Sequence, residues 1–122
     1  TRNNLNTVEH NTFAQFNLIP DYEKIGSYIS SGTNKYVVLM SFGYRTDKVI
    51  LENLLSHNFR YLGMMGSKEK TKTLFKELIN EGVNQQDLNR VHAPIGIQIS
   101  SKTPLEIAVS IMAQVTLVKN EA

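Results

Sequence analysis

The stretch Arg60–Lys72, RYLGMMGSKEKTK, decides the fold that this sequence predicts. An apolar strand over Arg60–Met65 passes through a Gly-x-x-Gly turn, Gly63 to Gly66, into a helix over Ser67–Glu81. A strand that leads directly into a helix is the unit from which parallel α/β sheets are built. The segment therefore predicts one βα unit of such a sheet.

The helix after the turn begins with lysines, which breaks a local rule. A helix N-terminus carries a partial positive charge and unpaired backbone N–H groups, so acidic residues are favoured there. Here Lys68, Lys70 and Lys72 occupy the first turns, with only Glu69 against them. Such a start suits a phosphate, a pyrophosphate or another oxyanion, and the alternative is a solvated basic face. We expect removal of Lys68 and Lys70 to weaken ligand binding and to leave stability nearly unchanged.

Strand and helix patterns alternate along the rest of the chain. The apolar run Lys35–Ser41, KYVVLMS, is typical of a strand buried on both faces. The other expected elements are a short helix at Tyr22–Ser31, a helix at Thr46–His57, a short helix capped by Asn84 and running through Arg90, and a third strand near Ile95–Ile99. This alternation predicts an α/β domain with a parallel sheet and right-handed crossovers. We expect residues 1–122 to form a single domain, with an irregular arm at 1–21.

The last helix has the clearest start signal in the chain. The sequence Thr103-Pro104-Leu105-Glu106 places a capping threonine, a proline at the first helical position and a reciprocal glutamate at the third. The helix continues to Asn120 and is apolar on most sides, so we expect it to be largely buried. Ser110, inside this helix, is expected to bond back to the preceding turn.

Composition limits the classes of protein that fit. The 122 residues suffice for one modest domain, and the net charge of +2 without a basic and aromatic cluster argues against nucleic acid as a partner. The lack of cysteine excludes disulfides and thiolate sites, and three dispersed histidines do not make a metal site. No apolar run reaches the roughly 18–20 residues that span a bilayer, and no signal peptide is visible. We therefore expect a cytoplasmic protein.

Three segments taken together resemble a known family. They are Tyr61–Lys70, YLGMMGSKEK, His92–Ile97, HAPIGI, and Thr103–Gln114, TPLEIAVSIMAQ. In this order and spacing they look like the C-terminal domain of the XdhC/CoxI family, the accessory factors of xanthine dehydrogenase and related molybdenum hydroxylases. The similarity runs from about Phe13 to Val118. It implies a Rossmann-like parallel sheet flanked by helices.

The resemblance also implies a function. Such a protein binds the molybdenum cofactor (molybdopterin), protects it, and helps its sulfurated form into a xanthine dehydrogenase-type hydroxylase, with a sulfurtransferase as a further partner. The chain would then be an accessory protein and not an enzyme. Two alternatives stay open: an NAD(P)-binding oxidoreductase domain, which would use the helix start for pyrophosphate, and a structural module for dimerisation or docking. The chain contains neither Gly-x-Gly-x-x-Gly nor a ribose-binding acid, which weakens the NAD(P) alternative.

Family members carry a Gly-rich strand–turn–helix and a second strand ahead of the region seen here. Thr1-Arg2 resembles the tail of a family Asp-x-Arg, so we expect a partial domain whose first βαβ unit lies upstream. Without that unit, the strand at Lys35–Ser41 would have an open edge, and the apolar faces that Phe13, Ile50 and Ile111 should pack against would be uncovered. Upstream sequence or a second copy should cover them, and a homodimer is the expected assembly.

The sequence departs from the family pattern in three places. Ser41-Phe42-Gly43 stands where the family often has Thr-His-Asp, so a histidine role there cannot be carried over, although Asp47 matches a downstream acidic position. Gln114 replaces a usual glutamate. Ser100 and Ser101 stand where a glycine usually follows the Pro-Ile-Gly segment.

The candidate cofactor-binding residues follow the expected strands, because ligands of open α/β sheets bind at the carboxyl ends of the strands. They are Gly63, Gly66, Ser67, Lys68 and Lys70 after one strand, and Gly43, Tyr44 and Arg45 after the other. Ser67 can cap the helix and offer its hydroxyl to an oxyanion. The second group would contact a pterin ring or a phosphate, or else form a plain loop. His92 is the one histidine placed to face a ligand, with a structural hydrogen bond as the favoured alternative. The pattern predicts no catalytic residue.

Overall fold

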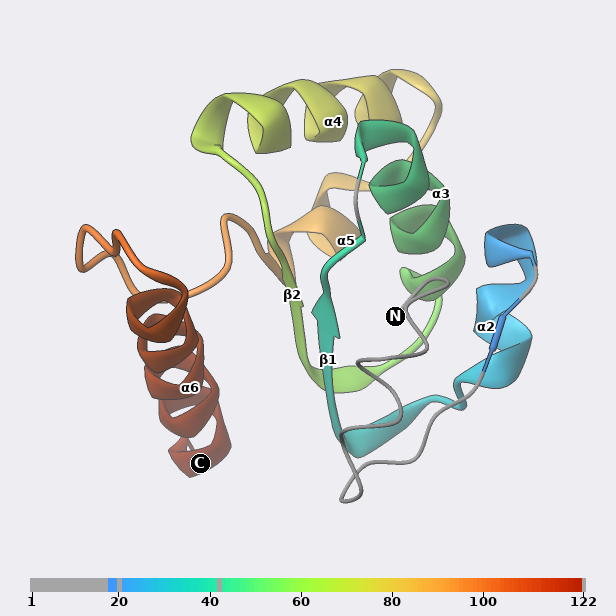
Figure 1. Cartoon of the computed structure of the whole chain (residues 1–122). Helices are drawn as coiled ribbons and strands as arrows, with labels where there is room; N and C mark the ends of the chain where they lie inside the picture. The colour runs from blue at the N-terminus through green and yellow to red at the C-terminus, as the bar shows by residue number, and fades with distance from the viewer. Residues whose placement is uncertain (1–17, 20, 42, 122) are drawn as a thin grey trace.

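The computed structural model describes residues 18–19, 21–41 and 43–121. The arm expected at 1–21, including Phe13, therefore lies almost entirely outside the described residues. In chain order the elements are the 3-10 helix η1 (Tyr22–Lys24), α2 (Ile25–Tyr28), β1 (Gly32–Leu39), α3 (Tyr44–Leu54), β2 (Phe59–Met64), α4 (Lys68–Asn80), α5 (Gln85–Asn89), β3 (Val91–His92) and α6 (Pro104–Asn120) (Figure 1).

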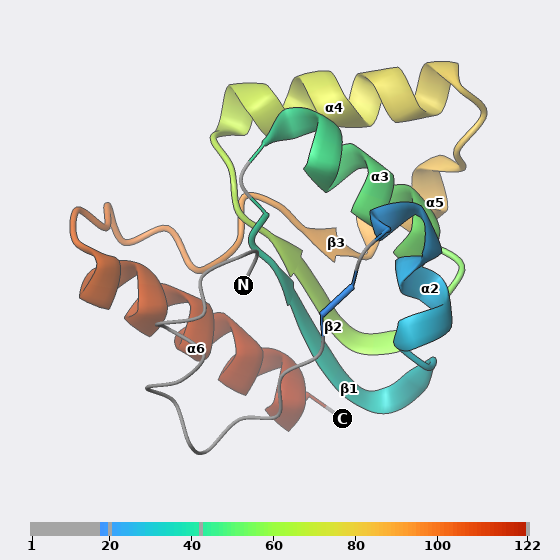
Figure 2. The same ribbon diagram turned by 45° about the vertical axis from the view of Figure 1, so that its right-hand side comes forward.

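The strands β1, β2 and β3 form one parallel sheet in that order, which confirms the predicted Rossmann-like α/β class. Tyr36 pairs with Tyr61 and Leu39 with Met64, whereas β3 pairs only through its two residues. Successive side chains of a strand point to opposite faces, so this register divides the strand side chains between the two faces of the sheet. Helices α3 and α4 lie on one side of the sheet and α6 lies on the other (Figures 1 and 2).

The face toward α3 and α4 holds the core. Helix α3 packs on β1 and against α4, and the strand residues Leu39, Leu62 and Met64 are buried here. The buried apolar side chains of this core are Ile25, Leu39, Ile50, Leu51, Leu54, Leu55, Leu62, Met64, Leu74, Leu78, Leu88 and Val91. Because α3 and α4 each follow a strand through a short turn, the right-handed crossover places both on the same face.

The face toward α6 is open, and three expectations about burial are corrected. Helix α6 packs along β2, and only Ser110 and Ile111 of its residues are buried. The expectation of a largely buried last helix is therefore wrong for the described part of the chain. The expectation of uncovered apolar faces at Ile50 and Ile111 is also wrong, because both side chains are buried within this chain. The strand expected to be buried on both faces also exposes Val38, and Met40 just beyond it, because α6 does not extend over β1.

Several boundaries also differ from the expected ones. Strand β1 begins at Gly32 and ends at Leu39, ahead of the expected Lys35–Ser41, and the first helical segment stops at Tyr28. The third strand is Val91–His92 and not Ile95–Ile99. The reason is that the Ile97 amide donates to the Ser110 carbonyl at 3.1 Å, which carries this segment out of the sheet and onto α6.

Three helix starts are as the sequence predicts, whereas α3 begins at Tyr44 and ends at Leu54 and does not span the expected Thr46–His57. The Ser67 hydroxyl accepts from the Lys70 amide at 3.1 Å, and the Asn84 side chain accepts from the Gln86 amide at 2.9 Å. The Thr103 hydroxyl caps α6 by accepting from the Glu106 amide at 3.1 Å. The Glu106 carboxylate reaches back one residue further than expected, to the amide of Lys102 at 2.7 Å. Within the described ranges, no helix combines the length and the apolar character needed to cross a membrane.

Candidate functional site

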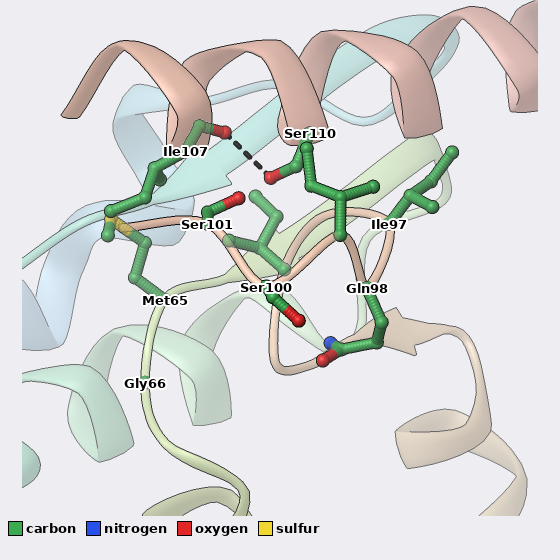
Figure 3. Close-up of a pocket in the computed structure, with 10 residues that line it drawn as sticks. Met65, Gly66, Ile97, Gln98, Ser100, Ser101, Ile107 and Ser110 are labelled. Atoms are coloured by element: carbon green, nitrogen blue, oxygen red, sulfur yellow. Dashed lines mark hydrogen bonds between the residues drawn. The ribbon is translucent and has the colours of Figure 1, made fainter. Parts of the chain in front are cut away.

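A pocket of about 280 Å³ lies at the carboxyl end of β2, between the Gly66 turn and the loop that leads into α6 (Figure 3). Isoleucines and hydroxyl or amide side chains share its lining, which consists of Met65, Gly66, Ile95, Ile97, Gln98, Ile99, Ser100, Ser101, Ile107 and Ser110. Ligand pockets typically combine apolar walls with a few polar groups. Its position is also the edge at which open α/β sheets bind ligands.

The N-terminus of α4 adjoins this pocket at Gly66. Gly66 has φ +155°, in the region that favours glycine, and Ser67 follows it as the helix cap. Among the described residues, the backbone amides of Gly66, Ser67 and Lys68 make no hydrogen bond. Open amides at a helix N-terminus form a ready site for an anion. The structure thus brings together four predicted site residues, Gly66, Ser67, Lys68 and Lys70, at one helix start.

Lys70 is held by a buried carboxylate. Its Nζ lies 2.5 Å from Oδ2 of Asp47, whose residue is only 1% exposed, and the Ser41 hydroxyl donates to the other oxygen of the same carboxylate. Lys68 is exposed. A buried charge is tolerated only when it is paired, so Lys70 has a structural role that Lys68 lacks. The expectation that both lysines can be removed without loss of stability is corrected for Lys70.

Sequence reasoning did not place Asp47 or Thr71 in the site. Asp47 lies on the buried stripe of α3, with Ile50, Leu51 and Leu54, and Thr71 lies on that of α4. A polar residue at an apolar position of an amphipathic helix was the available signal. Both side chains come close to the Gly66 turn, Asp47 through Lys70 and Thr71 directly.

Gly63 has a packing role. A Cβ at this position would stand 2.6 Å from Cδ1 of Ile95 and 2.7 Å from the Tyr61 hydroxyl. Only glycine therefore lets Ile95 lie over β2, and this packing shapes the pocket wall. A contact between Gly63 and a ligand stays a prediction.

Gly43, Tyr44 and Arg45 do not line the pocket. Gly43 caps α3, and the Tyr44 hydroxyl donates to Glu77 on α4, a bond that raises the pKa of Tyr44. The ion pair with Lys48 and the bond from Tyr44 lower the pKa of Glu77. Arg45 is exposed and lines a separate hollow beside η1. The Tyr44–Glu77 contact ties α3 to α4, and a ligand role for these three residues stays a prediction.

His92 stacks on Tyr61 and lines a different cavity. The two rings lie 4.7 Å apart at 12°, and the second cavity, of about 370 Å³, also includes Arg60 and Gln114. Burial lowers the pKa of His92 and raises that of Tyr61 to about 12. Within the described part of the chain the His92 ring makes no hydrogen bond, so its observed contact is the stack and not the structural hydrogen bond that we favoured. A ligand role for His92 stays a prediction.

Gln114 fastens α6 to the pocket loop. Its Oε1 accepts from the Tyr61 hydroxyl at 2.6 Å and from the Gly96 amide at 2.9 Å, and its Nε2 donates to the Gly96 carbonyl at 3.4 Å. The glutamate implied by the family pattern lacks the last donor. Ser110 donates to the Ile107 carbonyl at 2.8 Å, as predicted, and leaves no room for a side chain at Gly96. These contacts hold the loop that lines the pocket.

The structure is an open α/β domain with a pocket at the carboxyl edge of its sheet. Comparison with family models shows that the chain belongs to the XdhC Rossmann domain family, whose model matches residues 3–115. The resemblance seen in the three sequence segments is thereby confirmed.

Curated relatives include the uncharacterized protein YqeB of Escherichia coli K12, 36% identical over 76 residues, and a probable xanthine dehydrogenase subunit of Bacillus subtilis 168, 31% identical over 78 residues. These alignments cover 62% and 64% of this chain, and 14% and 22% of the relatives. The crystal structure of a xanthine dehydrogenase from Bacillus halodurans matches 83% of this chain with a TM-score of 0.64 and 30% identity. This chain covers 28% of that protein, so it corresponds to a minor part of each relative.

Proposed function

We propose that this chain is the Rossmann-like part of an accessory factor for a xanthine dehydrogenase-type molybdenum hydroxylase, and that it binds the molybdenum cofactor and assists its maturation and insertion. Membership of the XdhC family supports the link to such an enzyme, as do the names of two similar proteins. The observation that carries the proposal is the pocket at Gly66 beside the open amides of α4.

The residues present fit the chemistry of this cargo. Molybdopterin carries a phosphate and a flat pterin ring with polar edges. A phosphate suits the N-terminus of α4, and a flat ring suits a pocket with isoleucine walls and polar groups. The volume of about 280 Å³ lies just below the usual range of roughly 300–1,000 Å³ for ligand pockets. A ligand held there would be only partly enclosed, which suits a protein that passes its cargo to another.

In this proposal the chain binds and orients the cofactor and makes no covalent bond to it. The amides of Gly66, Ser67 and Lys68 donate to phosphate oxygens, and Lys68 adds positive charge from the surface. The sulfur would come from a sulfurtransferase, and the hydroxylase would receive the finished cofactor.

The proposal includes a second copy of the chain on the open face. Leu105 is 75% exposed on α6, and Val109 and Met112, on the same side of the helix, are also more than half exposed. Apolar side chains gathered on one face mark an interaction surface more often than a free one. Light scattering should report a dimer, and Val109→Glu with Met112→Glu should shift it to monomer. A wild-type monomer that binds no apolar dye would exclude this part of the proposal.

The function itself is tested with a molybdenum hydroxylase that lacks its cofactor. Adding the purified protein together with a molybdopterin source should raise xanthine oxidation, whereas the protein alone should oxidise no xanthine. Gly66→Ala should abolish the gain, because an alanine is strained at this φ. Gly82→Ala is the matched control, since its φ of +101° strains alanine in the same way, a Cβ there meets nothing within 4 Å, and Gly82 does not line the pocket. Equal gains from wild type and Gly66→Ala would refute the assignment.

A further inference from the structure

Thr71 presents a buried hydroxyl that has no partner. Its Oγ1 makes no hydrogen bond with any described residue, and the residue is 5% exposed. A buried polar group left without a partner costs roughly 1–3 kcal/mol, and nearly every such group in a native protein is satisfied. Valine has nearly the same shape and would avoid this cost. The hydroxyl therefore points to a partner that is not part of the described chain.

The unpartnered hydroxyl faces the start of α4. Thr71 Oγ1 lies 3.6 Å from the point where a Cβ on Gly66 would stand. Side chains of a helix lean toward its N-terminus, so Thr71 reaches back over the first turn, toward the open amides of Gly66, Ser67 and Lys68. The unpartnered hydroxyl and the three open amides thus belong to the same helix start.

The side chain of Lys70 also lies beside Gly66, but its charge is neutralised by an ion pair. Its Cδ lies 3.4 Å from the same point above Gly66, and its ammonium is paired with Asp47. The pair is close to neutral, while the ammonium still has donors beyond the one that Asp47 occupies. The positive potential at this helix start then comes from the helix dipole, equivalent to about half a charge, and from exposed Lys68.

We propose that Thr71, Lys70 and the amides at the start of α4 bind a single phosphate monoester, and that Asp47 sets this specificity by cancelling the charge of Lys70. A pyrophosphate carries more negative charge than this site can balance and would face the Asp47 carboxylate. The inference deepens the proposed function, since molybdopterin ends in one phosphate whereas a dinucleotide presents two. The phosphate site itself is argued from the contacts at α4. Only the identity of the rest of the ligand rests on the proposed function.

The first test uses Thr71→Val and Thr71→Ser in the full chain. Inorganic phosphate is titrated by calorimetry at low ionic strength, and melting temperatures are measured without phosphate. Thr71→Val should weaken phosphate affinity about tenfold, the loss of one hydrogen bond to a charged group, without lowering the melting temperature. Thr71→Ser should keep the affinity. A lower melting temperature with unchanged affinity in Thr71→Val would show a purely structural hydroxyl and overturn the proposal.

The second test compares inorganic phosphate with pyrophosphate. Wild type should prefer phosphate, and Asp47→Asn should reverse or remove that preference by freeing the charge of Lys70. The double variant Asp47→Asn with Lys70→Met removes both charges and should restore the preference, even if each change costs stability. A preference that is the same in all three proteins would exclude a specificity role for Asp47.

The two proposals fail in different experiments. Phosphate binding that depends on Thr71, together with no gain in hydroxylase activity, would support this site and reject the proposed function. A gain in hydroxylase activity that Thr71→Val does not alter, with no measurable phosphate binding, would reject this site and keep the function.

Discussion

The two faces of the sheet are built from the same strands, yet one is a closed core and the other is open. Toward α3 and α4, Leu39 and Met64 are buried among helix leucines, whereas toward α6 Val38 and Met40 remain exposed. Helices α3 and α4 follow their strands directly and must pack beside them. Helix α6 arrives after a long loop, contacts β2, and is anchored at its end by Arg60, which donates to the Val118 and Glu121 carbonyls at 3.0 and 2.6 Å.

The comparison shows that apolar sequence predicts burial only where a neighbour is in place. The last helix is as apolar as a core helix, but most of its side chains face away from the described residues. The pocket lies at the junction of the two faces, with one wall on β2 and the other on the loop into α6. The shape of the pocket therefore depends on both the closed face and the open face.

The largest expected effect is a difference in stability between two leucine-to-alanine variants, one on the closed face and one on the open face. Leu74→Ala, at a residue with 0% exposure on α4, should cost about 2–5 kcal/mol of unfolding free energy, because it leaves a cavity. Leu105→Ala, on the outer side of α6, should change the unfolding free energy of the dissociated monomer by less than about 0.5 kcal/mol. Denaturant unfolding measures both. A large cost for Leu105→Ala would show that the open face is covered in solution.

The next effect concerns the ion pair at the edge of the closed face. Lys70→Met should destabilise by about 2–3 kcal/mol, since it leaves the Asp47 carboxylate buried without its ammonium. Lys68→Met is the control, and it should be nearly neutral because Lys68 is exposed. Adding Asp47→Asn to Lys70→Met should recover part of the loss. Equal stabilities of the two single variants would contradict the pairing.

A smaller effect probes how well the open face excludes water. Burial lowers the pKa of His92 below its ordinary value of 6.5, so the unfolded chain binds a proton at a higher pH than the folded one. Stability should therefore fall as the pH drops below about 6.5, down to the lowered pKa of the folded state. His92→Phe keeps a ring against Tyr61 and should lose this component. Denaturant unfolding of wild type and of His92→Phe at about pH 7.5 and about pH 5.5 measures this component. An identical pH dependence of the unfolding free energy in the two proteins would mean that His92 is solvated.

The smallest effect lies in the pocket loop. Ser100 has φ +57°, a left-handed conformation that costs a residue with a side chain roughly 1–2 kcal/mol. Ser100→Gly relieves this strain but frees the unfolded chain, so a net gain of about 0.5 kcal/mol is expected. Ser101→Gly, at a position without positive φ, should lose stability instead. The melting temperatures of both variants test this prediction. A lower melting temperature in both would show that Ser100 is unstrained.

The sequence by itself determined the class of fold, the helix starts and the family. The strand–turn–helix at Arg60–Lys72 and the caps at Ser67, Asn84 and Thr103 were predictable, because each depends on contacts between residues close together in the chain. The family followed from three short segments in a fixed order, and the family model confirms it. Of the candidate site, the same local logic placed Gly66 and its neighbours at a helix start.

Only the tertiary structure decided what each of those residues contacts. The partner of Lys70 lies 23 residues away on another helix, and the need for glycine at Gly63 comes from Ile95, which the loop brings back over the strand. The same holds for the exposure of α6, which depends on what packs beside it. No local pattern encodes these contacts, because burial and pairing are set by elements that are distant in sequence and adjacent only in the folded chain.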